Sequence, residues 1–299
     1  MISPAPASRT IRDTITAFSV YLTGKAVDSP RLSAEMLLAH VLKIERLRLL
    51  VLRDTPLTEE QYTAAEQLVL RRGNGEPVAY LTGERDFYGR QFKVTQDTLI
   101  PRPDTELLID TALNEVSRQP SGRLFRFADL GTGSGCIAVS LAAESALCHG
   151  VAVDKSSKAL AVAKNNAETH SVSQQLDFIC ADFSTGIFSA ESFDMIISNP
   201  PYISDREYAE LDHGVRNFEP KSALVPDCTD SCGLEDAKRL LPLVHRWLKP
   251  GGIFLMEFGW KQGADILKLV EASGVVWNVA DILKDLEGRD RALLARRCD

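Results

Sequence analysis

Residues 127–142 read FADLGTGSGCIAVSLA, an apolar run, a glycine-rich loop and a second apolar run in immediate succession. The first run predicts a strand and the second a helix. Glycine permits a tight turn and lets backbone N–H groups approach a ligand closely, here at Gly131, Gly133 and Gly135. The helix N-terminus that follows favours an anion. The spacing is G-x-G-x-G and not the dinucleotide G-x-G-x-x-G, and such loops also serve as simple turns.

The alternation of strands and helices continues beyond this loop. Apolar runs predict strands at 125–130, 150–154, 176–182, 193–198 and 252–259, and helical stretches separate the first four. This alternation is typical of a parallel, doubly wound, Rossmann-like α/β sheet. Two final apolar runs, at 275–283 and 291–298, are separated by KDLEGRD and predict an antiparallel pair at the C-terminal end.

Three aspartates lie at the ends of predicted strands. Asp154 comes 19 residues beyond Gly135, where doubly wound folds place an acid on ribose hydroxyls. Asp182 can accept a hydrogen bond from an adenine amino group, and Asp129, just before the glycines, can hold an ammonium group. For each aspartate alone, an N-cap or a solvated loop is an equally good interpretation. Open α/β sheets bind ligands along the edge formed by the carboxyl ends of the strands. Three aspartates at this edge together therefore predict a cofactor site.

The fourth predicted strand runs directly into the tetrapeptide Asn199-Pro200-Pro201-Tyr202. The side-chain carbonyl of Asn199 can accept a hydrogen bond from a substrate NH2 group. Pro201 restricts Pro200 to extended geometry, which aims the Pro200 carbonyl as a second acceptor. The ring of Tyr202 can cover a flat group between the two acceptors. The tetrapeptide predicts a site for an amide or an aminopurine, although asparagine and proline also form simple turns.

Residues 1–85 differ in pattern from the rest of the chain and predict a small all-helical domain. One helix is predicted at 31–42, after the start signal Ser29-Pro30. Another is predicted at 58–72, with Thr58 as its N-cap and Gly73-Asn74-Gly75 as its end. Residues 86–100 alternate apolar and polar residues around turn formers and predict a β-hairpin linker. The α/β domain then occupies 101–299.

Composition narrows the class of partner. The chain has 299 residues and a net charge of −7 at pH 7, so it gains little from the counterion release that drives most nucleic-acid binding. We expect no direct nucleic-acid partner. No apolar stretch approaches the roughly 18 residues of a membrane span, and the N-terminus lacks a signal-peptide pattern, so we expect a cytoplasmic protein. We also expect a monomer. The six cysteines and five histidines show no metal-ligand spacing, and no metal is expected.

Several motifs together resemble those of one enzyme family. They are LIPRPDTE (99–106), ADLGTGSGCIAVSLA (128–142), SNPPYI (198–203), NFEPKSAL (217–224) and EFGWKQG (257–263). On these motifs the chain resembles the class I S-adenosylmethionine-dependent methyltransferases and, among them, the release-factor glutamine methyltransferases (the HemK/PrmC family). The resemblance covers nearly the whole chain. It departs from the family pattern at CTDSC (228–232), which adds loop residues, and at Trp260, where the family often has tyrosine.

The resemblance implies an activity and a cofactor. Members of the family transfer a methyl group from S-adenosylmethionine to the side-chain amide nitrogen (N5) of the glutamine in the Gly-Gly-Gln motif of class 1 peptide chain release factors. The helical N-terminal domain is then a docking surface for the release factor, or a lid that only stabilises the catalytic domain. Two fixed acceptors would orient the weakly nucleophilic amide nitrogen and stabilise its developing charge. This chemistry requires no strong general base.

The site residues follow from the same motifs. Catalysis is expected at Asn199, Pro200 and Tyr202. The substrate is expected to contact these three residues together with Pro201, Arg102, Thr105 and Glu106. The cofactor is expected to contact Asp129, Gly131, Thr132, Gly133, Gly135, Asp154, Asp182, Phe183 and Asn199.

Some of these assignments have structural alternatives. Thr105 and Glu106 equally suit the cap of a helix that begins there. Glu257 ends the fifth predicted strand and is expected to support the pocket. Phe87 and Tyr88 either line a substrate channel or anchor the hairpin.

Two other functions fit parts of the sequence. A DNA adenine-N6 methyltransferase uses the same tetrapeptide on a flipped base, but it should carry a basic recognition domain, and this chain has 41 acidic against 34 basic residues. A non-catalytic module that binds release factors would hold the cofactor only structurally. The intact Asn199 and glycine loop weigh against that second alternative.

Overall fold

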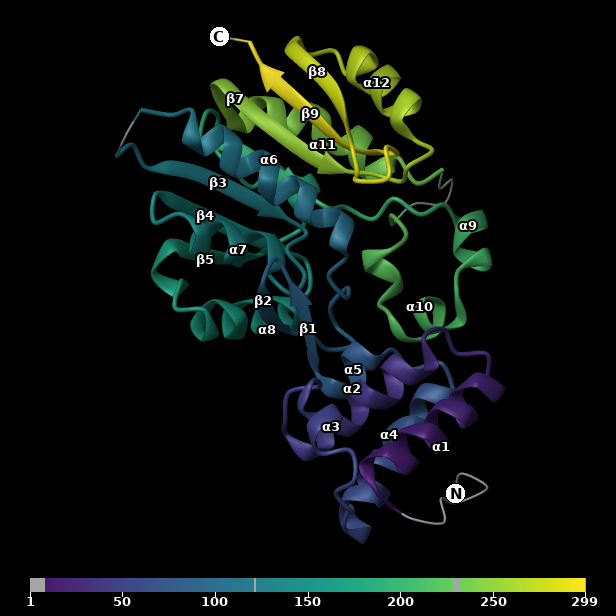
Figure 1. Ribbon diagram of the computed structural model, residues 1–299. Coiled ribbons are helices and arrows are strands. Elements are labelled where there is room, and N and C mark those ends of the chain that lie inside the picture. The colour runs from purple at the N-terminus through teal and green to yellow at the C-terminus, as the bar shows by residue number, and fades with distance from the viewer. Residues whose placement is uncertain (1–8, 121, 228–231, 299) are drawn as a thin grey trace. The chain divides into compact units, whose positions relative to one another are not determined.

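The computed structural model describes residues 9–120, 122–227 and 232–298 (Figure 1). Residues 1–8 of the predicted helical domain and residues 228–231 of the CTDSC loop lie outside the described part. The described chain divides into two compact units. One comprises the residues up to Glu84 together with Asp212–Phe218, and the other comprises Arg85–Leu211 with the residues from Glu219 onward.

The first unit is helical, as the sequence predicts. Its helices are α1 (Ile11–Gly24), α2 (Pro30–Leu42), α3 (Arg48–Val51), α4 (Glu59–Gly73), α5 (Val78–Thr82) and α10 (His213–Phe218). The apolar sides of α1, α2 and α4 share one core, which fully buries Phe18, Leu22, Leu37 and Val69. Full burial of each such side chain contributes about 1.5–3 kcal/mol, and this core holds the short helices together.

Two predicted helix starts are observed. The Thr58 side chain accepts a hydrogen bond from Gln61 N, and the Gln61 side chain accepts one from Thr58 N, which forms a capping box at the start of α4. Helix α2 begins at Pro30, but Ser29 has a φ of 48° and makes no side-chain cap bond. Proline at the first helical position therefore marks this start without help from a serine cap.

A short segment far along the chain belongs to the helical unit. Residues 212–218 were predicted to belong to the α/β domain, whereas Asp212–Phe218, which include α10, cluster with the helical residues. Gly214 lies so close to Gly75 that a Cβ atom on Gly214 would be 2.8 Å from the Gly75 carbonyl oxygen. Packing between residues this far apart leaves no local pattern in the sequence.

The second unit contains a seven-stranded sheet with the order β5-β4-β3-β6-β7-β9-β8. The strands are β3 (Phe125–Leu130), β4 (Cys148–Asp154), β5 (Leu176–Cys180), β6 (Phe193–Ser198), β7 (Leu248–Glu257), β8 (Trp277–Lys284) and β9 (Asp290–Arg297). The first five are parallel, and β9 runs antiparallel to both β7 and β8. The predicted doubly wound sheet with an antiparallel C-terminal strand is confirmed.

Helices cover both faces of this sheet (Figure 1). The larger ones are α6 (Glu106–Ser117), α7 (Cys136–Glu144), α8 (Ser157–Thr169), α11 (Glu235–Trp247) and α12 (Gly263–Ala272). Residues of α6, α7 and α8 pack with Phe127 of β3, whereas residues of α11 and α12 pack on the opposite face, where Ala128 points. The shorter turns are α9 (Asp205–Glu210), η1 (Pro103–Thr105), η2 (Ser173–Gln175), η3 (Phe183–Thr185) and η4 (Lys221–Ala223).

The predicted hairpin consists of β1 (Glu84–Phe87) and β2 (Arg90–Lys93). Tyr88 and Gly89 form its turn with φ values of 49° and 68°, the positive values that a type I′ hairpin requires. The Asn166 side chain of α8 accepts from Lys93 N (2.8 Å) and donates to Lys93 O (3.0 Å). These bonds attach the hairpin to the α/β unit.

The strand register brings the loops of interest together. Leu130 of β3 pairs with Ser198 of β6, and Ser198 pairs with Met256 of β7. The glycine loop, the Asn-Pro-Pro-Tyr tetrapeptide and the segment that starts at Glu257 therefore leave one edge of the sheet side by side. Within the described ranges, none of the helices combines the length and apolar character that crossing a membrane requires.

Candidate active site

A pocket opens at this carboxyl edge of the sheet. Its wall includes predicted residues for both the cofactor and the substrate, namely Gly131, Thr132, Gly133, Asp154, Asp182, Phe183, Asn199, Pro201, Arg102 and Thr105. The wall does not include the other predicted residues, which are Asp129, Gly135, Glu106, Pro200 and Tyr202. The structure thus gathers most of the expected site residues around one cavity, and the rest do not belong to its lining.

The glycine loop is held in shape by Asp154. Gly133 has a φ of 56°, which costs glycine little and other residues more. The Asp154 carboxylate accepts hydrogen bonds from Gly133 N (2.9 Å) and Ser156 N (2.8 Å). Asp154 therefore joins the loop to the start of α8 while it also lines the pocket.

Gly135 has a packing role at the end of the same loop. It has a φ of 80°, and a Cβ atom there would lie 3.0 Å from Ala163 Cβ and 3.2 Å from Ala163 Cα. Glycine at this position lets α7 begin against α8. This packing role is observed, and a contact between Gly135 and the cofactor stays a prediction.

Asp129 lies beneath the glycine loop, not in the pocket wall. Its Oδ2 accepts hydrogen bonds from Thr132 Oγ1 (2.6 Å) and Ala138 N (3.2 Å), while Oδ1 has no partner among the described residues. Burial raises the pKa of Asp129 to about 7. A buried carboxylate with a free oxygen favours a nearby positive group, which fits the ammonium group that the sequence analysis assigned to it.

Asp182 and Phe183 lie where the third predicted strand meets the pocket. Asp182 Oδ1 accepts a hydrogen bond from Ser184 N (2.8 Å) and caps η3, and the bonds to Ser184 lower the pKa of Asp182. The capping and ligand-binding interpretations of Asp182 are compatible, because the residue also lines the pocket. The Phe183 ring lies close to Gly131 and offers an apolar surface for a flat group.

At the other end of the pocket, Asn199 belongs to a chain of hydrogen bonds. Asn199 Nδ2 donates to Thr105 Oγ1 (3.1 Å), Thr105 Oγ1 donates to Glu257 Oε2 (2.6 Å), and the Tyr202 hydroxyl donates to Glu257 Oε1 (3.2 Å). Burial and the nearby Glu257 raise the pKa of Tyr202, so its phenol keeps its proton. The predicted supporting role of Glu257 thus has a concrete form, since this one carboxylate binds both Thr105 and Tyr202.

The side chains of two expected catalytic residues, Pro200 and Tyr202, do not line the pocket. Pro200 is buried, and the Tyr202 carbonyl accepts a hydrogen bond from Gln262 Nε2 (3.0 Å). The Tyr202 side chain is turned toward Glu257. A role for Tyr202 as a cover over the substrate stays a prediction.

The mouth of the pocket depends on a residue that the sequence analysis did not single out. Glu219 accepts hydrogen bonds from Arg102 Nη2 (2.6 Å) and Ile100 N (3.2 Å), and its side chain is almost fully buried. It fixes the segment that leads to Thr105. The signal was present, because Glu219 belongs to the NFEPKSAL motif, but its partners lie more than a hundred residues away.

Thr105 and Glu106 make bonds that bear on the helix-capping interpretation, while their contact with the substrate stays a prediction. Thr105 makes no side-chain cap bond to α6 and bonds to Asn199 and Glu257 instead. Glu106 accepts a hydrogen bond from Tyr88 N (2.8 Å), which ties it to the hairpin turn. Tyr88 therefore anchors the hairpin.

Four ionisable side chains at the Asp182 end of the pocket escaped prediction, namely Lys155, Asp227, Asp236 and Arg239. Lys155 pairs with Asp227, and burial raises the pKa of Asp236 to about 6. Asp236 lies in the first turn of α11, a position where acids are common for reasons of helix stability alone. Within the described ranges, no group of three or more His, Cys, Asp or Glu side chains is placed to hold a metal ion.

Two known protein families match successive parts of the chain. Residues 13–83 match the PrmC N-terminal domain, and residues 104–215 match the methyltransferase small domain. Three of the curated relatives are each named release factor glutamine methyltransferase. The protein of Nitratidesulfovibrio vulgaris is 47% identical over 276 residues, which are 92% of this chain and 91% of its own. That of Cereibacter sphaeroides is 40% identical over 284 residues (95% and 97%), and that of Escherichia coli K12 is 37% identical over 272 residues (91% and 94%).

Solved methyltransferase structures resemble the chain less closely. Ribosomal protein L11 methylase from Lactobacillus delbrueckii subsp. bulgaricus has a TM-score of 0.45 and 17% identity, over 66% of this chain and 81% of its own. The assignment therefore rests on the sequence relatives, which are 37% to 47% identical along more than nine-tenths of the chain. On that identity, this chain belongs to the release factor glutamine methyltransferases, the HemK/PrmC family of class I methyltransferases.

Proposed function

We propose that the protein transfers a methyl group from S-adenosylmethionine to the side-chain amide nitrogen (N5) of the glutamine in the Gly-Gly-Gln motif of class 1 peptide chain release factors. The orientation of the Asn199 amide carries this proposal. Its nitrogen donates to Thr105 Oγ1, and the residue lines the pocket. The carbonyl oxygen of Asn199 is therefore the atom left for a substrate, and an acceptor suits an NH2 group.

The substrate nitrogen needs assistance because its lone pair is delocalised into the amide carbonyl. Asn199 Oδ1 and the Pro200 carbonyl oxygen would each accept one N–H of the glutamine side chain. These bonds orient the lone pair and stabilise the positive charge that develops on nitrogen. Alignment of the reactants in this way contributes about 7–11 kcal/mol. No strong general base is required, since the N–H protons become acidic only as the new bond forms.

The pocket wall fits S-adenosylmethionine, which supplies a methyl group on a positively charged sulfur. An ionised carboxylate has about four acceptor positions, so the bonds from Gly133 and Ser156 leave Asp154 able to bind ribose hydroxyls. Asp182 and Phe183 would hold the adenine. The unpartnered Oδ1 of Asp129, beneath the glycine loop, supports an ammonium group nearby.

The helical unit would provide a docking surface for the release factor. Helix α3 and the residue before it expose three apolar side chains, Leu47, Leu50 and Val51, at 68%, 62% and 83%. Exposed apolar groups that lie together are typical of protein contacts. The net charge of −7 suits a basic partner. We also keep the prediction of a cytoplasmic monomer, which cell fractionation and light scattering would test.

The direct test is a methyl-transfer assay. The purified protein is incubated with labelled S-adenosylmethionine and a recombinant, unmethylated class 1 release factor, and tandem mass spectrometry locates the label. We expect a single methyl group on the Gly-Gly-Gln glutamine. A release factor in which alanine replaces this glutamine is the matched control and should receive none. Methylation of that control, or none of either factor, would contradict the proposal.

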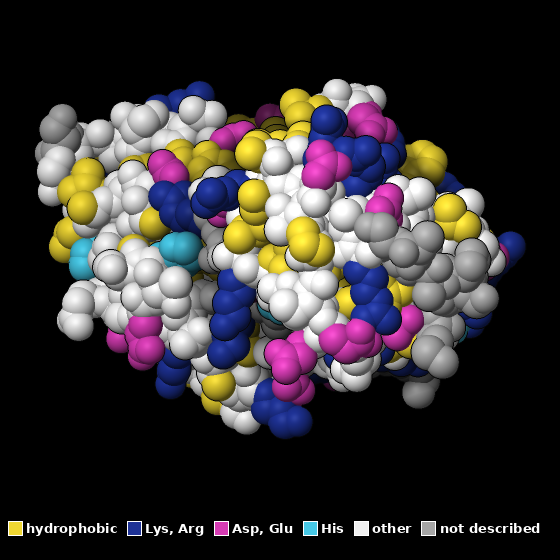
Figure 2. Space-filling model, turned by 60° about the horizontal axis from the view of Figure 1, so that its bottom comes forward, with side chains coloured by type: hydrophobic (Ala, Val, Ile, Leu, Met, Phe, Trp, Pro, Cys, Tyr) yellow, Lys and Arg dark blue, Asp and Glu magenta, His cyan; other side chains and the backbone are white. Residues whose placement is uncertain are grey.

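A DNA adenine-N6 methyltransferase remains the second candidate, because the acceptor geometry at Asn199 also suits an aminopurine. On the face drawn in Figure 2, basic and acidic side chains of the described residues lie interspersed, and the whole chain has fewer basic than acidic residues. Duplex DNA added to the same assay separates the two functions. Label on adenine would identify the DNA enzyme. Release-factor binding without any transfer would identify a non-catalytic module.

A further inference from the structure

Side chains from three separate segments form the hydrogen-bonded chain behind the pocket. Asn199 follows β6, Thr105 ends η1, and Glu257 ends β7. The bonds run from Asn199 Nδ2 to Thr105 Oγ1 (3.1 Å) and from Thr105 Oγ1 to Glu257 Oε2 (2.6 Å). Thr105 and Glu257 are 2% and 1% exposed. At this burial, bulk water cannot replace a missing partner in the chain.

The available protons determine which group donates and which accepts in each of these hydrogen bonds. A threonine hydroxyl has one proton, and an ionised carboxylate can only accept. Thr105 therefore gives its proton to Glu257 and can only accept from Asn199. The Asn199 amide must then present its nitrogen to Thr105, which leaves Oδ1 for the pocket. Without the hydroxyl, either end of the amide could face a ligand.

Glu257 is engaged at both oxygens. Oε2 accepts from Thr105, and Oε1 accepts from the Tyr202 hydroxyl (3.2 Å). Burial raises the pKa of Glu257, while the Thr105 bond, the positive charge of Arg291 and the Tyr202 bond lower it. Burial has the largest effect, so the pKa of Glu257 is raised overall. The direction of the hydrogen bonds therefore rests on geometry, because Oε2 accepts from Thr105 and Oε1 accepts from Tyr202.

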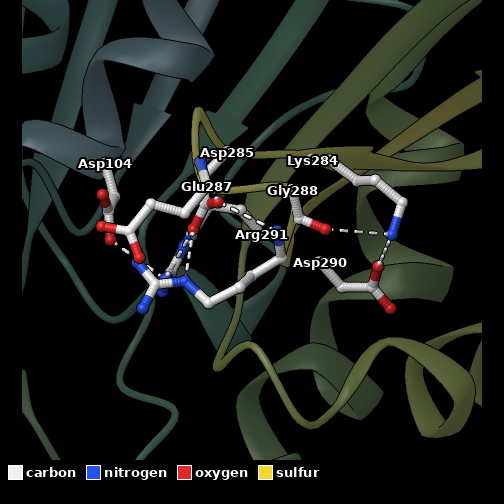
Figure 3. Close-up of polar contacts among 8 residues, drawn as sticks. Asp104, Lys284, Asp285, Glu287, Gly288, Asp290 and Arg291 are labelled. Atoms are coloured by element: carbon white, nitrogen blue, oxygen red, sulfur yellow. Dashed lines mark hydrogen bonds and ion pairs between the residues drawn. The ribbon is translucent and has the colours of Figure 1, made fainter.

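Arg291 supports the same corner of the site (Figure 3). Its Nη2 bonds to Asp104 Oδ2 (3.0 Å) and to Asp285 Oδ2 (3.2 Å). Asp104 immediately precedes Thr105 in η1, and Asp285 lies in the turn between β8 and β9. Figure 3 shows Arg291 between Asp104 and this turn. The C-terminal hairpin thereby helps to hold the η1 turn against the end of β7.

We propose that Thr105 and Glu257 are positioning residues, which set the Asn199 amide with its carbonyl oxygen toward the substrate, so that the site accepts from an NH2 group and does not donate to a carboxylate. The proposal rests on the proposed function in taking the glutamine amide as that NH2 group. Thr105 and Glu257, behind Asn199, would thus allow the site to distinguish a glutamine from a glutamate side chain.

Two substitutions of Thr105 test the role of the hydroxyl. Thr105→Val replaces it with a methyl group of similar size, and Thr105→Ser retains it. In Thr105→Val, kcat for methyl transfer should fall about tenfold or more, the effect of losing one hydrogen bond at the reacting group. The affinity for S-adenosylmethionine should stay unchanged. Thr105→Ser should recover most of the wild-type kcat.

A matched control is available on α6. The Thr111 hydroxyl donates only to Leu107 O of its own helix (2.8 Å), so Thr111→Val makes the same chemical change away from the site. It should retain the wild-type kcat and selectivity.

A binding measurement separates orientation from packing. The Kd is measured for an unmethylated release factor with Gly-Gly-Gln and for one in which glutamate replaces this glutamine. The wild-type protein should prefer glutamine by about tenfold or more, because Asn199 Oδ1 repels a carboxylate. In Thr105→Val the freed amide can turn its NH2 group to the carboxylate, so the ratio should approach one. Loss of packing alone would weaken both complexes equally and leave the ratio unchanged.

Glu257→Gln provides a second variant if Thr105→Val does not fold. Glutamine offers one oxygen and one NH2 group, so only one of Thr105 and Tyr202 keeps its acceptor. The same losses of kcat and selectivity are expected. Glu115→Gln is the control, because Glu115 is a buried glutamate near the C-terminal end of α6 that pairs with Arg296, and this variant should retain both.

The outcomes separate this proposal from the proposed function. Wild-type kcat and wild-type selectivity in a folded Thr105→Val or Glu257→Gln protein would overturn the positioning role. Failure of the wild-type protein to methylate any release factor would overturn the proposed function instead. In that case the ratio of the two Kd values still reports whether the Asn199 amide is held in one orientation.

Discussion

Asn199 donates a hydrogen bond from Nδ2 to Thr105 Oγ1 over 3.1 Å, although the two residues are 94 positions apart in the chain. The bond connects the loop after β6 with the η1 turn that precedes α6. It uses the donor end of the Asn199 amide for structure and leaves the acceptor end for a ligand. An amide side chain carries a donor and an acceptor on one planar group, which explains why asparagine suits this position.

Asn199→Ala should abolish most of the activity and retain the cofactor. Loss of one preorganised hydrogen-bonding group at the reacting atom lowers kcat by about 10²–10³-fold. The affinity for S-adenosylmethionine should change little, because the glycine loop, Asp154 and Asp182 remain. Single-turnover methyl transfer and calorimetric titration with S-adenosylmethionine measure the two effects. Asn165→Ala, at an exposed position of α8, is the control. An unchanged kcat in Asn199→Ala would show that another group activates the substrate.

Gly135→Ala should destabilise the α/β unit by clashing with α8. The new Cβ atom would lie 3.0 Å from Ala163 Cβ, in addition to the cost of a φ of 80°. We expect a loss of about 2–4 kcal/mol in the free energy of unfolding, measured with urea. Gly288→Ala has a nearly equal φ of 78° and open space around its Cβ position, so it should lose only about 1–2 kcal/mol. Equal losses in both variants would mean that backbone strain alone acts at Gly135.

Asp129 should make the stability of the α/β unit depend on pH. Its pKa is raised from 3.8 to about 7 in the folded protein, so the folded state binds more protons than the unfolded state between these values. The stability that Asp129 contributes is fully present below about pH 4 and is lost as the pH rises through 7. The free energy of unfolding should therefore fall by up to about 1.4 kcal/mol per pH unit in this interval.

Asp129→Asn isolates this effect. The amide oxygen can still accept from Thr132 and Ala138 N, but the side chain no longer titrates. Between pH 5 and pH 8, the wild-type protein should lose about 2–3 kcal/mol of unfolding free energy relative to the variant. Urea titrations at the two pH values provide the comparison. Parallel pH profiles would show that Asp129 is ionised throughout this range.

Local patterns were sufficient to predict most of the sheet. The runs at 125–130 and 193–198 coincide with β3 and β6, because strands buried on both faces are continuous apolar segments. The third run was predicted to reach Asp182, but β5 ends at Cys180. Asp182 turns instead to cap η3 through Ser184 N. A capping residue directly after an apolar run has no signature that separates it from a strand end.

The part of the site that could be predicted is the part that depends only on the parallel arrangement of the strands. Residues after adjacent parallel strands must meet at one edge, and this placed Asp154, Asp182 and Asn199 around one pocket. The bonds that join Arg102 to Glu219 and Thr105 to Glu257 run between residues 117 and 152 positions apart. Such contacts depend on the packed fold and leave no local pattern. The same reason explains why the sequence did not indicate that 212–218 belongs with the helical unit.

A single charge on α3 should weaken release-factor binding without affecting chemistry. Leu50→Asp places a carboxylate among the exposed Leu47 and Val51 side chains. Because Leu50 is exposed, the free energy of unfolding should change by less than about 0.5 kcal/mol. The KM for the release factor should rise about tenfold or more, as expected when a charge enters an apolar contact. The kcat at saturation and the affinity for S-adenosylmethionine should stay at wild-type values.

The matched control is Leu286→Asp, which introduces the same charge at a fully exposed leucine between β8 and β9. It should leave the KM for the release factor unchanged. If both variants raise KM equally, the effect comes from net charge and not from contact with α3. If neither does, the exposed side chains of α3 take no part in docking. A rise confined to Leu50→Asp would assign substrate recognition to the helical unit, because the catalytic pocket lies entirely within the other unit.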